Sequence, residues 1–206
     1  GKGIVDVRLS SNGTVVVSSI GAEFVESNFR LITQRNFFVS PGILDITSDL
    51  SAYSEVYVTF FNVFTCANSP LAFMTRINNT LVTLSGSYRY NTFSIVDGSS
   101  VSGFFINDMT IITNNVDNST NNRKRRSVSG YIRFFSPNNL NLVSAVTSWI
   151  SEMRHITQTG EEVYLKTVGR NNYSTTSGTK FEGLSIFVNS SNVNIAGGLI
   201  KVYGRL

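Results

Sequence analysis

The chain has 206 residues, enough for one large all-β domain with a substantial core. Charged residues make up 15% and hydrophobic residues 41%, which excludes a coiled coil, a long helical bundle and a charge-driven disordered chain. Its single cysteine, Cys66, excludes an intramolecular disulfide and a structural metal site built on several thiolates.

The net charge of +4 comes from one short segment. Four of the 17 basic residues are consecutive, and without them 13 basic residues balance 13 acidic ones; the four are Arg123, Lys124, Arg125 and Arg126. A duplex-binding protein usually spreads basic residues over a whole face, so we expect no nucleic-acid partner. No apolar run reaches the length of a membrane-spanning helix, and we expect no membrane insertion.

Short runs of β-branched and aromatic residues, separated by Asn, Gly and Ser, predict many strands and few helices. In chain order we predict strands at residues 15–17, 37–39, 56–64, 71–74, 104–106, 131–135, 163–168, 184–188 and 199–203. Turn signals such as Asp97-Gly98 indicate antiparallel connections. Residues 142–156 are the one segment with helical spacing, but their Val, Thr and Ser residues are poor helix formers and argue against a helix.

These elements predict an all-β fold, an antiparallel β-sandwich, over residues 37–206. Residues 1–36 are expected to form an N-terminal β segment, as a docking arm or as outer strands of the same sandwich. Residues 114–129, which contain an Asn-rich stretch and then the basic run, have little to bury and predict an exposed loop.

The sequence contains no recognisable catalytic or nucleotide-binding motif. The only histidine, His155, lies in a polar stretch and is expected at the surface or in a loop. The acidic pair Glu161-Glu162 cannot flank one glycosidic bond, because adjacent residues on a strand point to opposite faces. We therefore predict a protein that is not an enzyme and binds no cofactor, although calcium held by loop oxygens is left open.

Two sets of residues are candidates for binding. Arg123, Lys124, Arg125 and Arg126 could contact a polyanion or the carboxylates of a partner, the alternative being a solvated loop. Tyr88, Tyr90 and Tyr173 stand beside Arg and Asn, a composition suited to glycan or subunit contact, although tyrosines also occupy ordinary sandwich edges.

Two segments of the C-terminal half carry a recognisable pattern. One covers residues 130–139 and begins Gly130-Tyr131-Ile132-Arg133-Phe134-Phe135-Ser136-Pro137, and the other covers residues 181–204 and ends Ala196-Gly197-Gly198-Leu199-Ile200-Lys201-Val202-Tyr203-Gly204. Together they resemble a module of virion proteins in tailed bacteriophages. Residues 44–53 and the strand after them fit the upstream part of the module, so the resemblance covers residues 37–206. Ser136 and Val202 depart from the usual Asn and Leu of the family.

The resemblance implies a jelly-roll-like domain in a phage virion, either in the tail, as part of a fibre, tip or adhesin, or as capsid decoration or a head fibre. It implies other virion proteins and further copies of the chain as partners, with a trimer favoured and a host-surface glycan as an additional partner. It brings no catalytic residues. A free carbohydrate-binding module is the competing interpretation, which composition alone favours.

Overall fold

The computed structural model describes residues 28–39, 41–47, 50–67, 69–77, 80–83, 85–96, 98–113, 127–135, 148–156, 161–171 and 181–206, and the backbone of residues 5–9 and 15–19. Over these residues the chain forms one short 3-10 turn, η1 (Leu50–Ala52), and strands. The strands are β1 (Val5–Leu9), β2 (Val15–Ser19), β3 (Phe29–Asn36), β4 (Leu44–Ile46), β5 (Glu55–Thr65), β6 (Leu71–Ile77), β7 (Thr80–Leu81), β8 (Tyr88–Val96), β9 (Ser99–Asn107), β10 (Thr110–Ile111), β11 (Val128–Phe135), β12 (Ser148–Ile156), β13 (Glu162–Asn171), β14 (Gly183–Val188) and β15 (Ile195–Arg205).

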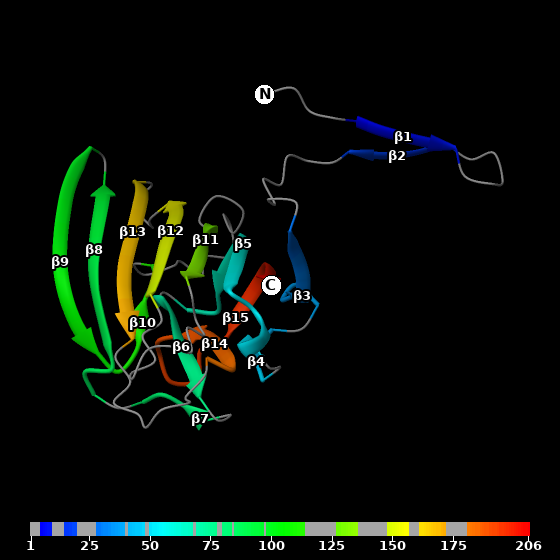
Figure 1. Cartoon of the computed structure of the whole chain (residues 1–206). Coiled ribbons are helices and arrows are strands. Elements are labelled where there is room, and N and C mark those ends of the chain that lie inside the picture. The colour runs from blue at the N-terminus through cyan, green and yellow to red at the C-terminus, as the bar shows by residue number, and fades with distance from the viewer. Residues whose placement is uncertain are drawn as a thin grey trace.

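Two antiparallel sheets make up the main body (Figure 1). The larger sheet has the strand order β3-β15-β5-β11-β12-β13-β8-β9, and the smaller has the order β10-β6-β14-β4, with β7 beside β6. Every pairing in both sheets is antiparallel. The predicted all-β sandwich is confirmed.

Aromatic side chains from both sheets meet in the core between them. Phe73 of β6 packs edge-on against Phe134 of β11 and Trp149 of β12, with ring centroids 5.3 and 5.4 Å apart. All three rings are almost completely buried, and they belong to one cluster that includes residues of both sheets. Burial of such large rings is the main source of stability in a sandwich of this kind.

Polar side chains also connect the two sheets. The backbone N–H of Thr75 on β6 donates to the phenol of Tyr88 on β8 over 2.9 Å. Asn171 of β13 donates its amide Nδ2 to the Thr75 hydroxyl, also over 2.9 Å. Because a buried polar group without a partner is costly, these bonds favour one alignment of the two sheets over others.

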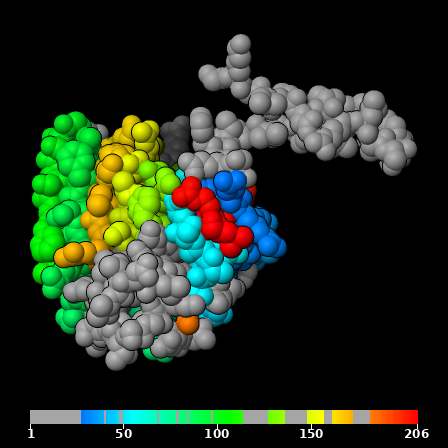
Figure 2. All heavy atoms as spheres, in the orientation of Figure 1, coloured from blue at the N-terminus to red at the C-terminus, as the bar shows by residue number. Residues whose placement is uncertain are grey.

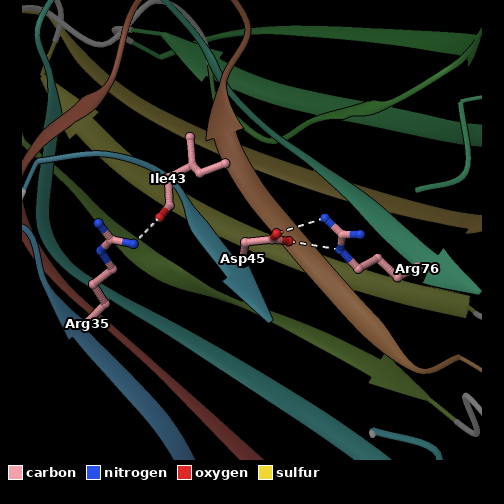
Figure 3. Close-up of polar contacts among 4 residues, drawn as sticks. All are labelled: Arg35, Ile43, Asp45 and Arg76. Carbon is pink, nitrogen blue, oxygen red and sulfur yellow. Dashed lines mark hydrogen bonds and ion pairs between the residues drawn. The ribbon is translucent and has the colours of Figure 1, made fainter. Parts of the chain in front are cut away.

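An ion pair spans the smaller sheet. Arg76 of β6 donates Nε and Nη2 to the two carboxylate oxygens of Asp45 on β4, over 2.9 and 2.8 Å (Figure 3). β14 lies between β4 and β6. Its first residue, Gly183, leaves room for the Arg76 side chain to reach across β14, since a Cβ there would lie 3.0 Å from Cδ of Arg76. Figure 3 also shows Arg35, which donates to the carbonyl of Ile43 over 2.6 Å.

One expectation about local structure is wrong. Residues 37–39 form a turn and not a strand, because buried Phe37 follows the end of β3 and its N–H bonds to the carbonyl of Gly198. Residues 148–156 form β12 between β11 and β13, in agreement with the argument against a helix in that segment. β3 pairs with β15, so residues 29–36 are an outer strand of the sandwich, one of the two alternatives for the N-terminal segment.

β1 and β2 pair with each other, in a separate two-stranded sheet (Figure 1). In the part of the chain that the structure describes, no helix is long and apolar enough to cross a membrane.

Candidate functional site

The outer face of the eight-stranded sheet carries the candidate site. Burial alternates along β12, where Trp149, Ser151, Met153 and His155 are buried and the residues between them are at least partly exposed. The same alternation runs along β13. Successive side chains of a strand point to opposite faces, so the exposed set forms a second, open face behind the core.

Glu152 lies in the middle of this face. The register of the sheet places Tyr131 of β11 opposite it on one side and Lys166 of β13 opposite it on the other. Lys166 Nζ lies 3.1 Å from Oε1 of Glu152, and the phenols of Tyr131 and Tyr164 also hydrogen-bond to this carboxylate. One carboxylate therefore accepts from three donors on two neighbouring strands.

The pKa values of the three tyrosines and the lysine around Glu152 are all raised. Burial, and then the charge of Glu152, raises the pKa of Tyr131 to about 12. The same two causes, in the same order, raise the pKa of Tyr164 and of Tyr57. The hydrogen bond to Glu152 and its charge raise the pKa of Lys166. Near neutral pH the phenols are thus neutral donors and the lysine is charged, which suits binding and not proton transfer.

Aromatic rings extend the cluster in both directions. The rings of Tyr57 and Tyr131 lie 5.3 Å apart and are tilted by 33°. On the other side the guanidinium of Arg154 lies 5.7 Å from the ring centroid of Tyr164, within the range of a cation-π contact. The outer face thus presents rings held by neighbouring polar groups.

An open hollow of about 500 Å³ lies at one end of this face. We call it the Glu152 groove; its lining residues are Ile95, Gly98, Glu152, Arg154, Glu162 and Tyr164. Carboxylates, a guanidinium and a phenol offer both donors and acceptors, the groups that recognise a ligand rich in hydroxyls. Among the described residues, no group of three or more His, Cys, Asp or Glu side chains is placed to hold a metal ion.

Tyr88 and Tyr90 do not lie on a surface. Both are buried on the inner face of β8, where Tyr88 donates its hydroxyl to the carbonyl of Val82 over 3.1 Å. Tyr90 accepts a hydrogen bond of 2.9 Å from Asn107, and its ring stacks on that of Phe105. Burial raises the pKa of Tyr88 to about 12. The expected glycan or subunit contact at these two tyrosines is therefore replaced by a core role.

The remaining sequence candidates have separate outcomes. Arg123, Lys124, Arg125, Arg126 and Tyr173 lie outside the described residues, and their roles stay predictions. His155 is buried in β12, contrary to the expected surface or loop position. Burial lowers its pKa to about 4.

Sequence reasoning missed the Glu152 cluster as a unit. Its residues come from three consecutive strands, and only the register in which β11, β12 and β13 pair brings them together. The available signal was the alternation of polar and apolar residues over residues 148–156, which has the two-residue period of a strand.

Comparison with known proteins finds no family model, curated protein or solved structure that matches this chain.

Proposed function

We propose that this chain is a non-enzymatic structural module of a tailed-phage virion, placed in the tail as part of a fibre, tip or adhesin. The observation that carries the proposal is the closing segment Gly198–Gly204, which resembles the last strand of phage virion modules. These residues lie in β15, which is hydrogen-bonded between β3 and β5 in the larger sheet. Capsid decoration, or a place in a head fibre, is the alternative location for the same module.

The distribution of apolar side chains supports a role in protein contact. Large hydrophobic residues remain exposed on several strands and turns, among them Leu31, Phe61, Phe93, Phe104 and Val168. Exposed apolar groups mark interaction sites where they gather on one surface, as Phe93 of β8 and Phe104 of β9 do on the outer face of two paired strands. The surface thus offers contacts for other virion proteins or for further copies of the chain.

The position of the one histidine supports a non-enzymatic role. The ring of His155 is buried on the inner face of β12, and among the described residues neither of its nitrogens has a hydrogen-bond partner. A general base must come within hydrogen-bond reach of the proton it removes, so this imidazole cannot serve a substrate on the outer face. The carboxylate of Glu152 already accepts from Lys166, Tyr131 and Tyr164, which favours a role in binding over one in proton transfer.

The proposal is tested on purified phage particles that encode this chain. Mass spectrometry of the particles should detect it, and immunogold labelling with an antibody against residues 28–206 should mark the tail. Labelling of the head would instead support the alternative, a role in capsid decoration or in a head fibre. Absence of the protein from washed particles would overturn the virion assignment.

A second candidate function, saccharide binding at the host surface, is favoured by the Glu152 groove. We expect purified host-surface polysaccharide to bind the chain, and the variant Arg154→Ala to weaken that binding at least about tenfold, as loss of a charged hydrogen-bond donor does. The control Arg30→Ala removes an exposed arginine on β3, at the opposite margin of the sheet. Equal binding by both variants would refute the groove as the glycan site.

A further inference from the structure

We infer that the free edge of β9 is the contact between two copies of this chain, which pair their β9 strands antiparallel and join their large sheets into one. The inference rests on the proposed function in one respect, that the chain acts through contacts between subunits. Its test uses the purified chain, so its failure leaves the virion assignment standing.

β9 is the last strand of the eight-stranded sheet and pairs along all nine residues with β8 (Figure 1). The green atoms of this hairpin form the left margin of the molecule in Figure 2. The strand contains no charged residue and no proline, and its register with β8 is continuous from Ser99 to Asn107. Charges, prolines and bulges are the usual means by which an edge strand resists pairing with another chain.

The opposite edge of the same sheet has those protections. β3 carries Arg30 and Arg35, and its pairing with β15 is interrupted by a register shift between Val202 and Tyr203. As far as the described strands go, the β3 edge of the sheet is therefore protected against pairing and the β9 edge is not. This asymmetry indicates that β9 is covered in the working protein.

Apolar side chains project from both faces of β9. The exposed fractions are 66% for Val101, 60% for Phe104, 42% for Phe105 and 51% for Ile106. Phe104 and Ile106 lie on the outer face, together with Phe93 of β8, whereas Val101 and Phe105 lie on the inner face. A partner that covers only one face would leave half of these groups in water, but a strand added to the edge reaches both.

The backbone of β9 offers regular hydrogen bonds to such a strand. Val96 pairs with Ser99 across a two-residue turn, and in a hairpin of this type the flanking residues bond to each other. Starting at Ser99, every second residue of β9 therefore hydrogen-bonds to β8 through its N–H and C=O groups. The other set points away from β8; it consists of Ser100, Ser102, Phe104 and Ile106.

The residue order of β9 is complementary to itself, which identifies the occupant as a second copy. With Gly103 on a twofold axis, Phe104 faces Ser102 of the second copy and Ile106 faces its Ser100. On the inner face, Phe105 faces Val101 of the second copy. Each large side chain thus contacts a small or apolar one, and β9 contributes no charged residue to the contact. The N–H and C=O groups that point away from β8 form the hydrogen bonds between the two β9 strands.

The exposed apolar side chains of β9 supply about half of the area that a standard dimer interface buries. The exposed fractions of the four β9 side chains correspond to about 400 Å² of apolar surface per copy, and backbone and β8 side chains add to this, against about 800 Å² per partner in a standard interface. We therefore expect a dimer of moderate affinity. Because strand pairing across a twofold axis joins two copies, this contact produces a dimer and not the trimer expected from the resemblance.

The test measures mass and amide exchange in the intact chain. Analytical ultracentrifugation up to about 0.5 mM should give a dimer mass, with a dissociation constant in the micromolar range. The variant Ile106→Lys places a charge on the pairing edge and should weaken dimerisation at least about a hundredfold. The matched control Leu31→Lys changes a residue of 46% exposure on β3 and should leave the dimer intact. Circular dichroism checks that both variants fold.

Amide exchange keeps the inference testable if Ile106→Lys does not fold. In the wild-type dimer, the N–H groups of Ser100, Ser102, Phe104 and Ile106 should exchange more slowly as protein concentration rises. A monomer at the highest concentration would overturn the inference. So would a trimer, a dimer unaffected by Ile106→Lys, or a dimer whose four edge amides exchange fast.

Discussion

Acidification should destabilise this protein through its one histidine. The imidazole of His155 is 3% exposed, its nitrogens have no hydrogen-bond partner within the part of the chain that the structure describes, and burial lowers its pKa to about 4. In the unfolded chain the same group has a pKa of about 6.5. Between these values the unfolded state binds the proton more readily than the folded state. Stability is therefore complete above a pH of about 6.5 and falls as the pH drops toward 4.

The expected size of this effect follows from the two pKa values. Between about pH 7.5 and about pH 5, the linkage relation gives a loss of about 2 kcal/mol from this one group. Carboxylates also titrate toward the lower end of this range, so the histidine effect is isolated by comparison with His155→Leu. That variant removes the only histidine in the chain and two buried nitrogens without partners, so it should be about as stable as wild type at neutral pH.

Urea unfolding at the two pH values provides the measurement. Trp149 is the only tryptophan and is 1% exposed, so its fluorescence reports unfolding of the core. Wild type should lose about 2 kcal/mol more than His155→Leu over this pH range. Equal losses in the two proteins, or an imidazole that titrates near 6.5 by NMR in the folded protein, would refute the argument from burial.

Three further predictions concern stability and the outer face. Gly198→Ala should lower the free energy of unfolding by more than about 2 kcal/mol, because φ is +104° there and a Cβ would lie 2.5 Å from the backbone of β5. The control Gly98→Ala has φ at +82° but open space around the new Cβ, so thermal denaturation should show a smaller loss. Glu55→Ala should cost about 2 kcal/mol by urea unfolding, because this buried carboxylate pairs with two partly exposed arginines. Glu55→Gln removes the charge and keeps the size, so a similar loss would support the charge argument and a much smaller one would contradict it. Glu152→Gln should lower the pKa of Tyr131 in an ultraviolet titration, and an unchanged value would contradict the assigned contact.

The strand content and the class of the fold were readable in the sequence. The strands at residues 184–188 and 56–64 could be predicted from local chemistry, because both segments are short runs of β-branched and aromatic residues. β14 and β5 confirm these two segments, and β5 lies inside the larger sheet. Residues 37–39 were wrongly predicted as a strand because apolar character alone does not distinguish a strand from a turn that buries Phe37.

Only the tertiary structure decided which residues meet. Glu152 contacts Tyr131 and Lys166 because β12 lies between β11 and β13 in one register, and a shift of one residue would move each side chain to the opposite face. The register of β8 likewise places Tyr88 on the buried face, although its neighbours in sequence are polar. Strand order and register depend on contacts between distant segments, which no local pattern encodes. The sequence therefore determined that the chain forms strands, and the packing of the two sheets determined which faces are buried and which edge is left open.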